Sequence, residues 1–184
     1  MKLSTVLCSF ALLLLVSSCA ELKIYPPGPN KQTLLILPVQ VTNKSQYSRH
    51  GFYYIYEILK AGSRSTAFEA IFKLPIKGDM LIVDMLPPGD YFVNKFIFKT
   101  VGSGDFTFGN NVQSRYDKFK LEAGKITIFS KSLNVLLFNS TPGRGKETTY
   151  NFKMVPVSSD QKRKILATLK ELPNFDTWEI TDTE

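Results

Sequence analysis

The chain has 184 residues, and 23 Lys and Arg against 16 Asp and Glu give it a formal net charge of +7. This balance favours contact with anionic surfaces such as lipid headgroups, lipopolysaccharide or acidic glycans, but it bears on association and not on fold. His50 is the single histidine, so a Ser-His-Asp triad or an imidazole-bound metal would have to use it. Its polar neighbours predict a loop residue instead.

The N-terminus has the pattern of a secretory signal. Lys2 supplies the charged start, an apolar run extends from Val6 to Val16, and small residues follow. A bilayer-spanning helix needs about 20 apolar residues, and the uncharged window at 3–18 is shorter. We therefore expect residues 1–18 to be an export signal, with an uncleaved membrane anchor as the alternative.

The tetrapeptide Val16-Ser17-Ser18-Cys19 resembles the lipobox of bacterial lipoproteins. The resemblance implies cleavage after Ser18, a diacylglyceryl group on the Cys19 thiol and acylation of the new amine. Two or more chains anchor a protein stably, because each buried methylene contributes about 0.8 kcal/mol. Enteric lipoproteins with Asp after the cysteine stay at the inner membrane, so Ala20 implies the outer membrane, facing either the periplasm or the cell surface. No cofactor is expected beyond this covalent lipid.

Cysteine content restricts the chemistry of the mature chain. Removing residues 1–18 from the 184 leaves 166 residues with a formal charge of +6, which suits one domain. Cys8 is lost with the signal and Cys19 is acylated. Disulfides, thiol catalysis, zinc–cysteine sites and iron–sulfur clusters are therefore excluded for a lipoprotein, and no metal site is expected.

Residues 19–30 are expected to be the lipidated cysteine and a tether. Pro26, Pro27 and Pro29 oppose helix and strand, and a proline-rich spacer extends by about 3 Å per residue. Such a tether holds the domain roughly 30 Å from the membrane.

Residues 31–157 alternate apolar and polar side chains in short runs. Ile, Val, Phe and Tyr are frequent in these runs, and Gly, Pro and Asn separate them, as is typical of strands and turns. The pattern predicts an antiparallel β-sandwich or barrel. Its nine expected strands are 33–42, 52–59, 67–74, 80–86, 91–100, 116–121, 126–130, 133–139 and 148–155.

The clearest turn lies within Leu86–Tyr91. Pro88 fixes φ near −65°, and Gly89 can adopt the positive φ that a type II turn needs next. The string Leu-Pro-Pro-Gly-Asp-Tyr-Phe-Val at 86–93, with Gly-Lys-Ile-Thr at 124–127, resembles transthyretin-like and carboxypeptidase-regulatory-like β-sandwich lipoproteins. The resemblance implies a transthyretin-like or Ig-like sandwich of seven to nine strands and carries no catalytic residues.

Residues 158–184 are expected to be a C-terminal helix and tail. Ser158 and Gln161 form a capping-box pattern. An apolar stripe at helical spacing should pack on the sandwich near Trp178, and it consists of Ile165, Leu166, Leu169 and Leu172. Pro173 ends the helix. The other side carries a candidate contact for anionic surfaces, made of Arg163, Lys164 and Lys170.

The expected function is that of a non-enzymatic structural or interaction module in the bacterial envelope, an accessory subunit or binding domain. No activated nucleophile or paired acid and base is visible, so an enzyme is not expected. The alternatives are an anionic glycan- or lipid-binding module, which clustering of Lys118, Lys120, Lys125 and Lys153 on one face would favour, and a surface adhesin. The expected partners are the membrane and other envelope proteins, not nucleic acid. The aromatic run at 52–56 is expected to pack in the sheet, with stacking on sugars as the alternative.

Overall fold

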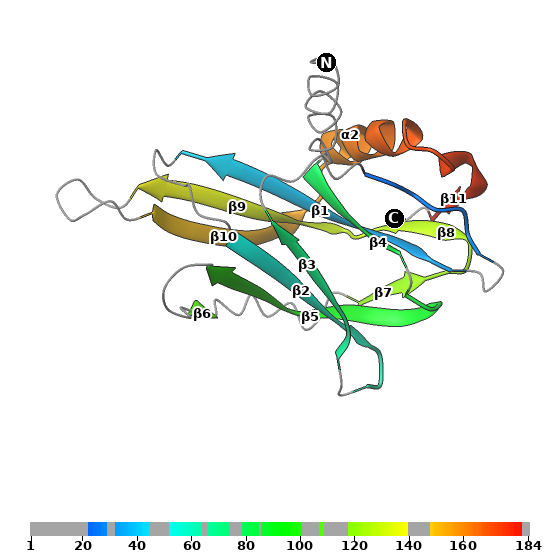
Figure 1. The fold of residues 1–184 in the computed structure, drawn as a ribbon, viewed down its shortest axis with the longest axis horizontal. Helices are drawn as coiled ribbons and strands as arrows, with labels where there is room; N and C mark the ends of the chain where they lie inside the picture. The colour runs from blue at the N-terminus through cyan, green and yellow to red at the C-terminus, as the bar shows by residue number, and fades with distance from the viewer. Residues whose placement is uncertain are drawn as a thin grey trace, which may run out of the picture.

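The structure, a computed structural model, describes residues 22–28, 32–44, 52–63, 66–73, 79–84, 86–100, 107–108, 118–139 and 148–181. This part of the chain is mainly β, with one α-helix near its C-terminal end (Figure 1). The strands are β1 (Leu34–Asn43), β2 (Phe52–Lys60), β3 (Thr66–Lys73), β4 (Met80–Asp84), β5 (Gly89–Thr100), β6 (Thr107–Phe108), β7 (Lys118–Leu121), β8 (Lys125–Ile128), β9 (Lys131–Asn139), β10 (Thr148–Pro156) and β11 (Glu179–Ile180). The helices are α2 (Ser159–Lys170) and the 3₁₀ turn η3 (Phe175–Thr177).

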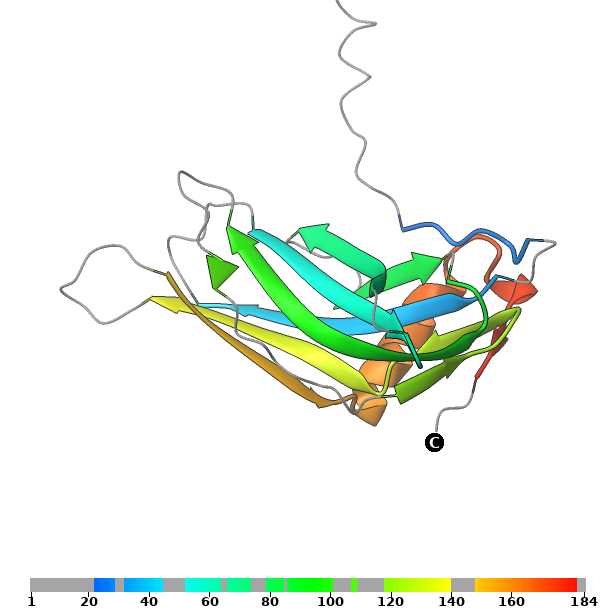
Figure 2. The same cartoon turned by 90° about the horizontal axis from the view of Figure 1, so that it is seen from below.

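The strands form two sheets that face each other. The first has the order β10-β9-β1-β8-β11, with β4 also paired to β1. The second has the order β3-β2-β5-β6, with β7 also paired to β5. Viewed from the side of the second sheet, α2 lies behind both sheets (Figure 2). The described chain therefore has three layers, with the first sheet in the middle.

Strand β1 is the centre of the core because both of its faces are buried. Leu35, Leu37 and Val39 point into the cluster between the two sheets, where Tyr56, Tyr91 and other residues of the second sheet meet them. Leu34 and Ile36 point the other way, into a second cluster under α2. Every residue from Leu34 to Val39 is buried. The clean alternation of a half-exposed strand is therefore absent from this segment.

The nine expected strands are present with small shifts of their ends, but the expected antiparallel arrangement is wrong for the first sheet. Strand β1 runs parallel to β8 and then to β9, and β11 also runs parallel to β8. The first sheet is mixed and the second is antiparallel. The two parallel pairs of β1 join segments about 90 residues apart in sequence, which a local alternation pattern does not encode.

Pro38 lies in β1 at the point where the strand changes partner. Ile36 pairs with Ile128 and Val39 pairs with Leu133, so two residues of β1, Leu37 and Pro38, lie opposite four of the β8–β9 segment. The ladder is interrupted here. A proline has no N–H to donate, and an interruption is where a central strand tolerates one.

The turn before β5 is held by the hydroxyl of Tyr91, which donates a hydrogen bond of 2.8 Å to the carbonyl oxygen of Pro87. Burial raises the pKa of Tyr91. Gly89 has a φ of +155°. This angle is positive, as expected, but a type II turn requires a φ of about +80° there. The turn is therefore of another type.

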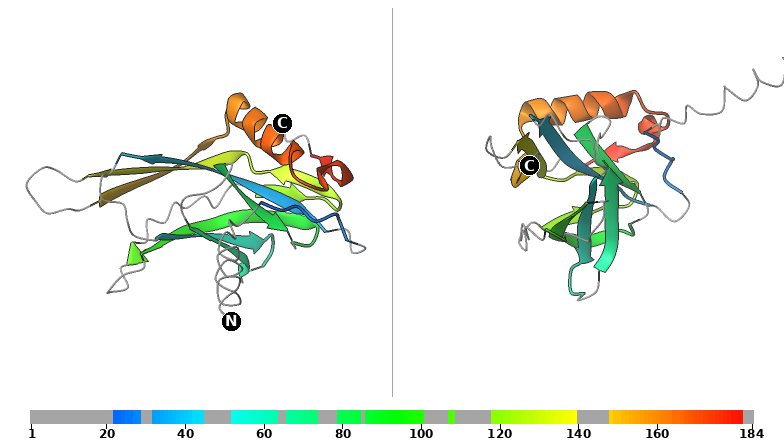
Figure 3. Two further views of the ribbon diagram at one scale, coloured as in Figure 1. Left: turned by 45° about the horizontal axis from the view of Figure 1, so that its top comes forward. Right: turned by 60° about the vertical axis from the view of Figure 1, so that its left-hand side comes forward.

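Helix α2 begins as expected. The Ser158 hydroxyl accepts a hydrogen bond of 3.2 Å from the Gln161 backbone N–H. The Gln161 side chain does not close the capping box; it donates to the Ser132 hydroxyl on β9 at 2.8 Å. Ile165 and Leu169 are buried against β1 and β8, and Leu166 and Leu172 pack at the border of the same cluster. Figure 3 shows α2 lying across the outer face of the first sheet.

Candidate functional site

The proposed cleavage residue Ser18 and lipidation residue Cys19 lie outside the described residues. The first described residue after them is Leu22. The segment 22–28, which we call the strap, is thus the described part of the chain nearest in sequence to the expected anchor.

The strap is packed on the folded domain. Ile24 is only 2% exposed and belongs to the cluster that contains Leu34, Ile36 and Trp178, and Leu22 packs at its border. Two side chains near the C-terminal end hold the strap backbone. Asn174 Nδ2 donates to the Ile24 carbonyl oxygen at 3.0 Å, and Trp178 Nε1 donates to the Tyr25 carbonyl oxygen at 2.9 Å.

This arrangement departs from the expected free tether. The three prolines indicated a spacer over 19–30, but residues 22–28 belong to the folded unit. In Figure 1 the strap is drawn in blue beside β11 and the C-terminal end of α2. The signal that favoured docking was the alternation Leu22-Lys23-Ile24-Tyr25, in which Lys23 and Tyr25 are exposed while Ile24 is buried.

The basic residues of α2 lie where the helical period placed them. Arg163, Lys164 and Lys170 are exposed on the side away from Ile165 and Leu169. Arg163 is ion-paired with Asp160 on the same helix. Their surroundings are therefore not uniformly positive.

Lys164 also borders a hollow of about 350 Å³ between α2 and the start of β4. Asp79 lies on its other side, and Gln161 and Thr168 add polar groups. The hollow thus offers a cation and a carboxylate together. An anion entering it would meet both charges.

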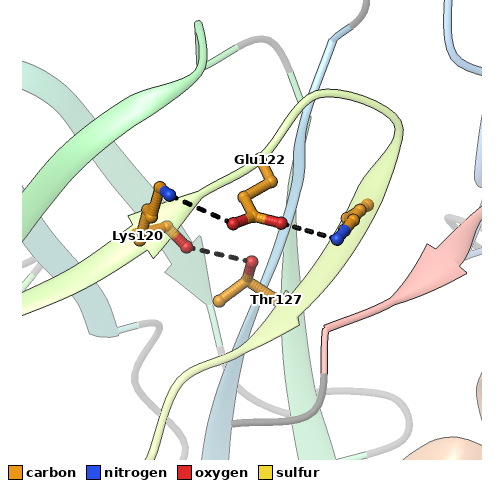
Figure 4. Close-up of polar contacts among 4 residues, drawn as sticks. Lys120, Glu122 and Thr127 are labelled. Carbon is orange, nitrogen blue, oxygen red and sulfur yellow. Dashed lines mark hydrogen bonds and ion pairs between the residues drawn. The ribbon is translucent and has the colours of Figure 1, made fainter.

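The second group of lysines is neutralised in part by Glu122. Its carboxylate lies between Lys120 Nζ at 3.2 Å and Lys125 Nζ at 2.6 Å (Figure 4). The hydrogen bond from Lys125, then that from Lys120, holds the pKa of Glu122 below its usual range, and the Glu122 carboxylate raises the pKa of Lys125. Thr127 Oγ1 donates to the Lys120 carbonyl oxygen at 3.3 Å, which ties β8 to β7.

These lysines do not share one face. Phe119 and Leu121 pack in the core between the sheets, so Lys118 and Lys120 point to the outside of the second sheet. Met154 packs against the same core from β10, so its exposed neighbour Lys153 points to the outside of the first sheet. The clustering that would have favoured the anionic-ligand alternative is therefore not observed.

The aromatic run at 52–56 lies in β2. Tyr56 is fully buried between the sheets, and burial raises its pKa. The side chains of residues 52–55, and the whole of His50, lie outside the described part of the molecule. Tyr56 thus packs in the core, as expected for this run, and the other four positions stay predictions.

The acidic residues of the described ranges are dispersed. Asp79 and Asp90 are exposed and Asp84 is half-buried. Within those ranges, no three His, Cys, Asp or Glu side chains come together in a way that could hold a metal ion. None of the helices described has the length and hydrophobicity needed to span a bilayer.

Comparison of the sequence with protein-family models gave no match, and a search among curated proteins found no relative.

Proposed function

We propose that the protein is a bacterial envelope lipoprotein, anchored to the outer membrane through Cys19, whose mature part is a non-enzymatic structural or interaction module. The observation that carries this proposal is the lipobox-like string Val16-Ser17-Ser18-Cys19 at the end of an uncharged apolar run. Docking of the chain onto the domain from Leu22 supports it, because the folded unit then begins three residues after the expected anchor.

For the mature part we propose a β-sandwich related to transthyretin-like domains. Two facing sheets with a shared apolar core support this assignment. The Tyr91 hydroxyl bond to Pro87 supports it further, because a tyrosine that bonds back to the backbone just upstream, a tyrosine corner, is a feature of Ig-like sandwiches. The parallel pairing of β1 with β8 and β9 makes this chain a variant of the simple antiparallel pattern.

The chain contains its own control for the anchor. Its two cysteines are Cys8, inside the expected signal, and Cys19. Cells expressing Cys19→Ser should incorporate no fatty-acid analogue into the protein, and the protein should leave the membrane fraction. Cys8→Ser should be labelled and sediment like the wild type. Labelling of Cys19→Ser, or loss of labelling in Cys8→Ser alone, would overturn the proposal.

Binding of anionic lipid or glycan is the second candidate function, favoured by the exposed row of Arg163, Lys164 and Lys170. Each cation near an anionic surface contributes about 1 kcal/mol, and salt screens the attraction. The lipid-free chain from Ala20 should then bind anionic vesicles and lose most binding between about 50 and 300 mM salt.

Charge reversal distinguishes vesicle binding through this row of cations from binding through the net positive charge of the whole protein. Changing Arg163, Lys164 and Lys170 to Glu should weaken vesicle binding strongly without changing the melting temperature, since exposed substitutions rarely change stability by more than about 0.5 kcal/mol each. The matched variant changes Lys44, Lys118 and Lys153, all exposed elsewhere, to Glu. Equal losses in the two variants would contradict a specific role for α2.

A further inference from the structure

The strap places the domain close to the lipid. A spacer of residues 19–30 would allow a separation of roughly 30 Å. Leu22 already packs on the domain, and only Ala20 and Glu21 lie between it and Cys19, so three Cα–Cα steps join the two residues. At no more than about 3.6 Å per residue, the chain between them spans about 11 Å at most.

The outward side of the strap has the chemistry of a membrane interface. Tyr25 is 61% exposed although its backbone carbonyl is held by Trp178. Among the described residues it is a large hydrophobic side chain that stands out from the surface. Lys23 is exposed on the same side, because Ile24 between them points inward. Tyrosine is enriched at the headgroup level of bilayers, and a lysine stem lies along apolar surface with its charge in water.

Charged side chains of both signs lie on and around the strap, so electrostatic attraction to anionic lipid is not needed for contact. The C-terminal segment that holds the strap carries the exposed carboxylates of Asp176 and Glu179, which offset Lys23 on the strap and Lys125 on β8, the register partner of Glu179. Net attraction to an anionic surface is therefore not expected at this end of the molecule. Contact here depends on the short anchor and on Tyr25.

We propose that the strap is a membrane-contact surface, which seats the lipidated protein directly on the bilayer with Tyr25 among the lipid headgroups. The proposal rests on lipidation of Cys19. It also sets the orientation, because Asn174 and Trp178 connect the strap to the segment that pairs with β8. The end of the domain that carries β11 and η3 then faces the lipid.

The intrinsic fluorescence of Trp178 can report how close the strap lies to the lipid. Trp178 is the single tryptophan, and its Nε1 donates a hydrogen bond to the Tyr25 carbonyl oxygen of the strap. The full-length lipidated protein is placed in phosphatidylcholine vesicles that carry a nitroxide on the headgroup, and Trp178 fluorescence is measured. We expect strong quenching. Ten Gly and Ser residues inserted between Glu21 and Leu22 should reduce the quenching at least about twofold, since a flexible insert of this length adds about 17 Å.

Two controls complete the test. The same ten residues added after Glu184 should leave the quenching unchanged. Tyr25→Glu should reduce it and Tyr25→Phe should not. Unquenched Trp178 in protein shown to be acylated and membrane-bound, or equal quenching with and without the insert, would overturn the membrane-contact surface. Absence of acylation would instead overturn the proposed lipoprotein function.

Discussion

Glu122 is a single residue whose charge state is set by its neighbours. Lys125 and Lys120 contact its two carboxylate oxygens at the half-buried turn between β7 and β8, and their hydrogen bonds lower its pKa. A folded-state pKa below the unfolded value contributes stability that is present above the unfolded pKa and is lost as the pH falls through the folded pKa. The contribution is small because both pairs are accessible to solvent.

We therefore expect the Glu122 carboxyl to titrate with a midpoint below about 4.3, the ordinary value for glutamate. The carboxyl carbon shift, followed by NMR against pH, measures it. Lys125→Gln should move the midpoint upward, whereas Lys153→Gln, on the other side of the molecule, should not. A midpoint at or above the ordinary value would mean that the ion pairs do not form.

Gly89 is a second position where the local backbone conformation favours one residue type, glycine. Its φ of +155° is one that side chains rarely adopt, and an added Cβ would lie 3.4 Å from Lys60 Cε and 3.5 Å from Tyr91 Cε2. We expect Gly89→Ala to lower the free energy of unfolding by about 1–3 kcal/mol, since such backbone strain costs that much.

Denaturant midpoints at equal m-value measure this loss. Gly28→Ala is the control, because Gly28 has no such positive φ and its added Cβ would only approach the flexible Gln32 side chain. An unchanged midpoint for Gly89→Ala would show that the backbone here relaxes readily to negative φ.

Among the elements, the strap contributes to the core. Ile24→Ala removes apolar contacts from the cluster under α2, and deletion of a buried Ile side chain to Ala costs about 2–5 kcal/mol. Tyr25→Ala removes a larger but exposed side chain and should change the free energy of unfolding by about 0.5 kcal/mol or less. Chemical denaturation of the chain from Ala20 compares the two. Equal effects would mean that the strap is not docked in solution.

The strands and the helix were predictable because each has its own local period. The stripe Ile165, Leu166, Leu169 and Leu172 recurs at helical spacing, and the nine expected strands alternate or run apolar over four or more residues. Strand β11 and η3 have two and three residues, which is too short for any period. The register shift in the pairing of β2 with β5 was also invisible. Glu57 pairs with Lys95 and Ile58 pairs with Val93, so Asn94 of β5 has no register partner in β2.

The mixed pairing and the docked strap depend on contacts between distant parts of the chain. The unbroken apolar run Leu34–Leu37 was a signal of a strand buried on both faces, which is typical of parallel pairing. For the strap, the prolines led to the prediction of a tether, although the alternation of Leu22 and Ile24 with polar residues indicated packing on the domain. The hydrogen bonds from Asn174 and Trp178 span about 150 residues, and no sequence rule places them.

For the whole molecule, helical spacing correctly placed the α2 cations on the exposed side. It could not say how the lysines of β7 and β10 relate, because that depends on which sheet each strand joins. The two groups point to opposite outer faces, so the net charge of +7 does not imply one basic surface. The proposed anchor differs from these features, because the lipobox-like string Val16-Ser17-Ser18-Cys19 is a local motif and its assignment does not depend on the fold.

Analysis of the mature N-terminus is therefore the sharpest test of the proposed lipidation at Cys19. The protein is extracted with detergent from the membranes of the cells that naturally produce it and digested, and its N-terminal peptide is analysed by mass spectrometry. We expect a peptide that begins at Cys19 and carries the mass of a diacylglyceryl group, with or without a further acyl chain. A peptide that retains residues 1–18, or one that begins at Cys19 without lipid, would contradict it.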